Sequence, residues 1–151
     1  MSFNALQNQP ATTIISGDGF YPDLKVAEFQ ANYRMPAEYA EGMIAEHIAE
    51  ARLWAVKQLV ARRAEWEGEG YTTLAAIPLF GIAGEAERTF KRAVFCHAKN
   101  LLLPQFATTE RREAARHDAR ESPEITANFE AMAQEAIANL LGKSRITVAV
   151  L

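Results

Sequence analysis

The most regular feature of the chain is a set of apolar residues that recur every three or four positions. Between residues 36 and 67 this spacing is carried by Ile44, Ile48, Ala51, Ala55 and Leu59, with Trp66 further along. Side chains at such intervals share one face of an α-helix, which is buried against a core. Pro36 suits the first helical position, because proline lacks an N–H and its φ is already helical. The pattern predicts one long helix from Pro36 to about Glu67, stopped by Gly68 and Gly70.

Two later segments show the same spacing. The first predicts a helix over about residues 84–106, with apolar positions at Ala86, Phe90, Val94, His97 and Leu101. Pro104 should kink or close this helix near its end. The second has its apolar face at Ile125, Phe129, Met132, Ala136 and Leu140. We expect it to start at Ser122 and Pro123 and to end at Gly142. The charged stretch 108–122 between the two is expected to be an exposed helix or a partly disordered loop.

The two ends of the chain have a different character. Residues 1–19 are rich in Asn, Gln, Thr and Gly, which is typical of a mobile arm. After it, Asp23 could cap a short helix that ends near Tyr33. Residues 144–151 carry β-branched side chains at alternate positions, which predicts a strand. A single strand in a helical chain leaves backbone groups unpaired unless it meets the arm or another subunit.

Together these patterns predict a mainly α fold: a small helical bundle with one long helix. We expect three parts, namely a flexible N-terminal arm over residues 1–19, a helical domain over 20–143 and a C-terminal strand over 144–151. A chain of 151 residues fits one domain and can bury roughly 68 to 70% of its unfolded surface. No disulfide or metal is needed for it to fold.

The composition argues against a dedicated nucleic-acid-binding protein, a disulfide-bonded protein and a membrane protein. Sixteen basic and 19 acidic residues give a net charge of −3, whereas a dedicated nucleic-acid-binding domain usually has a pI above about 9. Cys96 is the only cysteine, so no intramolecular disulfide can form and a reducing compartment is expected. We expect no export signal, and no run approaches the roughly 18 apolar residues that a membrane span needs.

The sequence predicts no catalytic, cofactor or metal site. The three histidines, His47, His97 and His117, lack metal-binding spacing. Cys96 and His97 are neighbours on a predicted helix and would point about 100° apart, so the histidine would not activate the thiol. A small hydrolase is the weakest alternative, and it would use Glu46, His47 or Glu50. We therefore expect that the protein is not an enzyme.

Four bases are the candidate contacts with DNA. They are Arg88, Lys91, Arg92 and Lys99, in a segment from residue 85 to 100 that has only two acids. A ring of subunits would repeat this patch around a channel, where it would meet phosphates without sequence preference. The alternative is an ordinary solvated face, paired with Glu87 or with acids of the preceding helix.

Several segments, taken in order, resemble a known family. They are Gly19-Phe20-Tyr21-Pro22-Asp23, Gly70-Tyr71-Thr72-Thr73-Leu74, Phe90-Lys91-Arg92-Ala93-Val94-Phe95-Cys96, Leu101-Leu102-Leu103, and Leu141-Gly142-Lys143-Ser144-Arg145-Ile146-Thr147-Val148. From about Gly17 onward this series resembles the phage head completion/stabilisation protein family, the L gene product of temperate contractile-tailed phages.

The resemblance implies a small helical virion protein without a catalytic site. Such an adaptor docks on the portal after DNA packaging, helps retain the genome and prepares the head for tail attachment. The implied partners are the portal protein, a tail or neck completion protein, packaged double-stranded DNA, and other copies of the chain in a ring of roughly twelve. The protein would be made in the bacterial cytoplasm and incorporated at the virion neck, with no membrane partner.

This role would also give the C-terminal strand a partner. An extended tail can add a strand to a neighbouring subunit or to the portal. The expected contact residues are Arg145, Ile146, Thr147, Val148 and Val150. The main alternative is a helical DNA- or protein-binding regulator of phage or bacterial origin, for which the helix over 84–106 is too apolar to be convincing.

Overall fold

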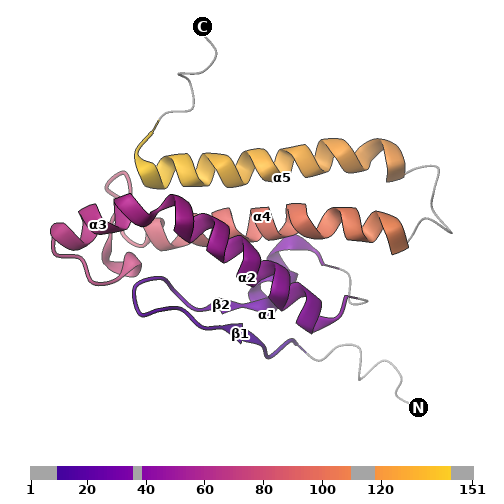
Figure 1. Ribbon diagram of the computed structural model, residues 1–151, viewed down its shortest axis with the longest axis horizontal. Helices are drawn as coiled ribbons and strands as arrows, with labels where there is room; N and C mark the ends of the chain where they lie inside the picture. Colours follow the sequence, from indigo (N-terminus) through magenta and orange to yellow (C-terminus); the bar gives the residue numbers. More distant parts are fainter. Residues whose placement is uncertain (1–9, 36–38, 110–117, 144–151) are drawn as a thin grey trace, which may run out of the picture.

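A computed structural model describes residues 10–35, 39–109 and 118–143, and this part of the chain is mainly α-helical (Figure 1). Helices α4 and α5 lie side by side along most of their length, and α2 and α1 pack against α4 (Figure 1). The prediction of a mainly α fold is confirmed. In chain order the elements are β1 (Ile14–Ile15), β2 (Leu24–Lys25), α1 (Val26–Tyr33), α2 (Glu41–Gln58), α3 (Val60–Gly68), the 3₁₀ turn η1 (Leu74–Ala76), α4 (Glu85–Thr109) and α5 (Asp118–Leu141).

Helix α4 forms the centre of the core. Four consecutive residues, Ala93 to Cys96, are buried, so the helix is covered on more than one side. On α2 the predicted apolar face is confirmed, because Ile44, Ile48, Ala51 and Ala55 are all fully buried. On α5 the described part of the predicted face is buried at Ala136 and Leu140, whereas Phe129 and Met132 are only half-buried.

The prediction of one unbroken helix from Pro36 to about Glu67 is wrong. Helix α2 begins only at Glu41, and Pro36 lies outside the described residues. The helical ladder then breaks at Leu59, whose N–H donates to Val56 O, three residues back, with φ −101° and ψ 5°. Helix α3 follows and places Trp66 against the ring of Phe20, with 6.3 Å between ring centroids. That contact joins residues far apart in sequence, and periodicity cannot reveal it.

Two predicted helix starts also need correction. Asp23 does not cap α1, because β2 separates this residue from the helix. The Oδ1 atom of Asp23 instead accepts a hydrogen bond from Gly17 N–H at 2.7 Å. Helix α5 begins at Asp118, four residues before Ser122, so Pro123 does not occupy the first helical position.

The predicted helix ends have mixed outcomes. Pro104 does not close α4, which continues to Thr109. Gly142 ends α5 as predicted, with φ +69°. The N–H groups of Gly142 and Lys143 donate to Asn139 O at 3.2 Å and Ala138 O at 2.9 Å, the hydrogen-bond pattern of a Schellman motif.

The second half of the expected arm is attached to the helical body. Residues 14–15 of β1 pair antiparallel with residues 24–25 of β2. The N–H groups of Thr12 and Thr13 donate to Glu41 Oε1, at 2.8 and 2.7 Å, in the first turn of α2. Residues 1–9 and the predicted strand 144–151 lie outside the described residues, so the three-part division of the chain stays a prediction.

Gly17 offers a test of this attachment. A Cβ at Gly17 would lie 2.1 Å from Tyr21 O, a backbone atom that cannot move without disturbing the turn. We expect Gly17→Ala to lower the free energy of unfolding by about 2 kcal/mol or more, measured by chemical denaturation. Gly42→Ala is the matched control, because nothing lies within 4 Å of its Cβ and it sits in α2. It should leave stability unchanged or raise it by up to about 1 kcal/mol. Equal effects of the two substitutions would contradict the assignment.

Candidate functional site

Three of the segments that carry the family resemblance meet in space. Leu74 N–H donates to Phe20 O at 2.9 Å, which joins the segment after α3 to the turn that follows β1. The ring of Tyr21 stacks on Phe90 of α4, with centroids 4.8 Å apart and planes at 20°. These three motifs, separate in the sequence, therefore form one packed region of the fold.

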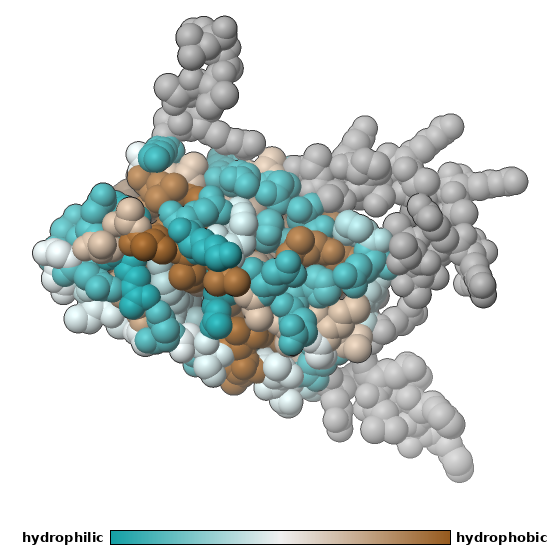
Figure 2. Space-filling model, in the orientation of Figure 1, coloured by the Kyte–Doolittle hydropathy of each residue, from teal (hydrophilic) through white to brown (hydrophobic). Residues whose placement is uncertain are grey.

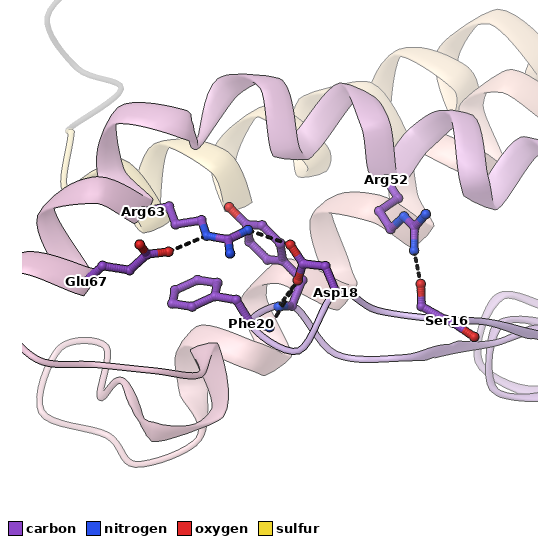
Figure 3. Close-up of polar contacts among 7 residues, drawn as sticks. Ser16, Asp18, Phe20, Arg52, Arg63 and Glu67 are labelled. Atoms are coloured by element: carbon purple, nitrogen blue, oxygen red, sulfur yellow. Dashed lines mark hydrogen bonds and ion pairs between the residues drawn. The ribbon is translucent and has the colours of Figure 1, made fainter.

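Arg63 of α3 clamps this region (Figure 3). Its Nη1 lies 2.5 Å from Asp18 Oδ2, and its Nε lies 2.6 Å from Glu67 Oε1. The guanidinium also lies over the rings of Phe20 and Tyr21, 4.6 and 5.3 Å from their centroids. The opposite oxygen of Asp18 accepts the N–H groups of Phe20 and Tyr21 at 3.0 and 2.9 Å. One arginine thus fixes the turn against α3 by charge and by ring contact.

The charges in this clamp fit a structural role. Burial raises the pKa of the Asp18 carboxyl, but the hydrogen bonds from Tyr21, Arg63 and Phe20 outweigh it and hold the pKa below its usual value of 3.8. Burial raises the pKa of Tyr21 to about 12, so its phenol stays protonated at neutral pH. Neither group is prepared to act as a nucleophile or base.

The second feature is an open groove between α1, α4 and α5. Its volume is about 840 Å³. All four bases predicted as DNA contacts lie on it, so the structure brings them together. The lining is formed by Glu28, Asn32, Tyr33, Arg34, Gly84, Glu87, Arg88, Lys91, Arg92, Phe95, Lys99, Leu103, Phe129 and Met132. Arg34 is a fifth base that sequence analysis missed, since only the αL conformation at the end of α1 places it there.

Three of the four predicted bases, Arg88, Lys91 and Arg92, differ in their exposure and in their ion pairs. The side chain of Arg88 is 75% exposed, and its Nε lies 4.0 Å from Glu85 Oε2. Arg92 is also exposed. Lys91 instead lies between two carboxylates, with Nζ 3.5 Å from Glu28 Oε2 and 3.8 Å from Glu87 Oε1. Lys91 therefore follows the alternative given for these bases, in which a base pairs with Glu87 and does not contact DNA.

Lys99 is a correction to the predicted exposed patch. It is only 9% exposed, so its ammonium is not presented to a DNA backbone. Its Nζ donates to Tyr33 O at 2.8 Å and lies 3.5 Å from Met35 Sδ and 5.9 Å from the centroid of the Phe129 ring. Desolvation lowers the pKa of Lys99. The helical spacing places this residue on α4 correctly, but its neighbours come from α1 and α5.

Three of the residues considered for catalysis, His97, His47 and Cys96, make structural contacts. His97 Nδ1 lies 3.1 Å from Glu130 Oε2, and its ring stacks on Trp54 with centroids 4.0 Å apart. His47 Nδ1 lies 2.8 Å from Met43 O, one turn back on α2. Cys96 is buried, which raises the pKa of its thiol, and its Sγ lies 3.7 Å from Tyr33 Oη rather than against His97.

The described residues contain neither a metal-binding cluster nor a membrane-spanning helix. Across the described ranges, no group of three or more His, Cys, Asp or Glu side chains is placed to hold a metal ion. Among the helices of the same ranges, none combines the length and the hydropathy of a membrane span. His117, the third histidine, lies outside the part of the chain that the structure describes.

Comparison with known proteins gives a consistent assignment. The sequence profile of the phage head completion protein (GPL) family matches residues 15–151. A probable head completion/stabilization protein of Haemophilus phage HP1 (strain HP1c1) is 31% identical over 148 residues, which cover 97% of this chain and 97% of that protein. The chain belongs to the phage head completion protein family. No solved structure matches the chain significantly.

Membership of this family confirms the resemblance that the sequence motifs indicated. The chain is therefore a bacteriophage virion component with a mainly helical fold. The match begins at Ile15, the second residue of β1, so the family region includes the clamp and the groove.

Asp18→Asn tests the clamp through the pH dependence of stability. Because the folded pKa of Asp18 lies below its unfolded value, the ionised carboxylate stabilises the fold above about pH 4, and this contribution is lost as the pH falls through the folded pKa. The side chain of Asp18 is 49% exposed, so we expect the variant to lose only about 1 kcal/mol at pH 7. Urea denaturation should show the gap to wild type narrowing below about pH 4. Glu69→Gln, at an exposed position, is the control. A gap that does not change with pH would disprove the role of the charge.

Proposed function

We propose that the protein is a head completion adaptor that docks on the portal after DNA packaging, helps retain the genome and prepares the head for tail attachment. The observation that carries this proposal is the family match, which extends over nearly the whole chain. The adaptor would lie at the neck of the virion and act without a catalytic site, by binding and by closing the exit.

Exposed apolar side chains support an assembly role. Phe80 is 72% exposed and Ile82 is 56% exposed, on a tight turn closed by two hydrogen bonds between Leu79 and Ile82 at 3.1 and 2.9 Å. Phe80 has φ +51°, a conformation that costs a residue other than glycine about 1 kcal/mol or more. An exposed aromatic held in this way is typical of a contact surface.

A second apolar area lies on the face formed by α2 and α3. Leu53 of α2 and Val60 of α3 are 53% and 64% exposed. Figure 2 shows hydrophobic patches, in brown, between hydrophilic areas, in teal. A free subunit that exposes such side chains has surfaces suited to other copies of itself, to the portal or to a tail or neck completion protein. A ring of roughly twelve copies remains part of this proposal.

Among the four bases predicted as DNA contacts, only the exposed ones are accessible to the packaged DNA. Arg88 and Arg92 have the exposure that phosphate contacts need. Lys91 is paired and Lys99 is buried, so neither would contribute directly. Retention of the genome does not itself require this contact, because a subunit can also close the exit by occupying it.

The regulator alternative finds less support in the fold. A DNA-binding regulator inserts an exposed helix into the major groove. Helix α4, the basic candidate, is instead the central helix of the core, and its bases share a groove with apolar side chains. Gel shifts at two salt concentrations should show no sequence preference, and a clear preference for one sequence would favour the regulator.

Co-purification with the portal protein of the same genome tests the adaptor role. We expect the two proteins to elute together, and electron microscopy of the eluted complex to show this protein in a ring beneath the portal. The free protein is the control for particles that form without a portal. Absence of binding to assembled portals, both with and without packaged DNA, would contradict the proposed function.

The C-terminal tail gives a separate prediction. We propose that residues 145–151 add a strand to a partner during assembly, through Arg145, Ile146, Thr147, Val148 and Val150. Deleting residues 146–151 should leave a folded helical protein, checked by circular dichroism, that fails to join heads. A variant with the same tail residues in an order that breaks the apolar alternation is the matched control for composition, and it should fail as well. An unchanged yield of tail-competent heads from either variant would disprove strand addition.

A further inference from the structure

The groove between α1, α4 and α5 combines an apolar lining with positive charge. The apolar part comes from all three helices: Tyr33 of α1, Phe95 and Leu103 of α4, and Phe129 and Met132 of α5. The ionisable lining contains five bases and two carboxylates, a net of three positive charges. Because Lys91 lies near both carboxylates, Arg34, Arg88 and Arg92 are left as a positive rim.

The dimensions of the groove suit a helix. Its lining follows α4 from Gly84 to Leu103, which corresponds to about 28 Å at 1.5 Å per residue. A helix of about 20 residues spans about 30 Å and would run along this length. Amphipathic helices bind such grooves by placing one apolar face against the floor.

Lys99 adds a buried positive charge beneath the rim of the groove. An ammonium has three N–H donors, and a buried charge is costly unless it is paired. Within the described ranges its contacts are one carbonyl, one thioether and one ring face, with no carboxylate among them. Lys99 lines the groove, so its charge adds to the positive potential of the rim without direct contact with a ligand.

We propose that this groove binds an acidic amphipathic segment of another virion protein. The apolar side chains of the segment would cover Tyr33, Phe129 and Met132, and its carboxylates would meet the rim arginines. This inference rests on the proposed function in one respect, since it takes the partner from the virion to which the adaptor belongs.

A protein segment fits the groove better than DNA does. A DNA backbone binds mainly through phosphates and sugars and gains little from an apolar floor. The rings of Phe95 and Phe129 lie in the groove, and the structure places Lys99 among them rather than on an exposed face. An acidic amphipathic helix satisfies both the charge and the apolar surface.

The test uses the full chain, fluorescently labelled, and overlapping peptides of about 20 residues that cover the other virion proteins of the same genome. We expect the bound peptides to carry acidic residues together with apolar residues spaced by three and four. Fluorescence anisotropy should then show that Arg88→Glu with Arg92→Glu weakens their binding about tenfold or more. The matched control is Lys25→Glu with Lys57→Glu, two exposed bases outside the groove lining, which should bind as wild type does.

A second substitution examines the apolar floor. Met132→Gln removes an apolar group from the lining without changing charge, and we expect it to weaken peptide binding several-fold at high salt, where the charge contribution is screened. Thermal unfolding shows whether this variant is folded. If it is not, Leu103→Gln, on α4, serves as the second probe of the floor.

Three results would overturn the proposal. The first is that the bound peptides lack acidic residues, and the second is that no peptide binds. The third is that a duplex DNA of about 20 base pairs binds in place of the peptides, and that the two arginine substitutions abolish this DNA binding. Each of these outcomes leaves co-purification with the portal unaffected. Failure of the groove and failure of the adaptor role are therefore distinguishable.

Discussion

Helix α4 carries a run of buried residues from Ala93 to Cys96, and this burial organises the rest of the fold. Helices α1, α2 and α5 and the turn η1 all contact it. Each large apolar side chain removed from water contributes about 1.5 to 3 kcal/mol, so Phe90 and Phe95 alone outweigh any single surface ion pair. The other helices are positioned by the need to cover α4, and the groove is the part of that covering left open.

The clamp around Arg63 serves a different purpose from the core. Its ion pairs are partly exposed and contribute little energy one by one. Together with the two ring contacts, they fix the turn after β1 in one geometry against α3. This explains why a short motif around Phe20 and Tyr21 carries family resemblance although it contains no reactive group.

An assembly protein needs surfaces that the isolated subunit leaves unsatisfied. This chain has three within its described residues: the strained turn at Phe80, the apolar positions on α2 and α3, and the basic groove with Lys99 at its base. Each of the three can be buried or neutralised by a partner, which is how exposed apolar and charged surfaces contribute to docking.

The sequence by itself determined the mainly helical fold, the buried face of α2, the buried positions Ala86, Phe90 and Val94 on α4, the end of α5 at Gly142 and the family. Spacing and local motifs express these directly. The sequence also identified four of the five bases on the groove. Only the tertiary structure decided that the helical ladder breaks at Leu59 and that Lys99 is buried. It also decided that the Asp23 carboxylate accepts a hydrogen bond from Gly17 N–H and does not cap α1. Each of these depends on contacts between residues distant in the chain, such as Lys99 with Tyr33 and Phe129. Periodicity reports which residues share a face of a helix, but it does not report what covers that face.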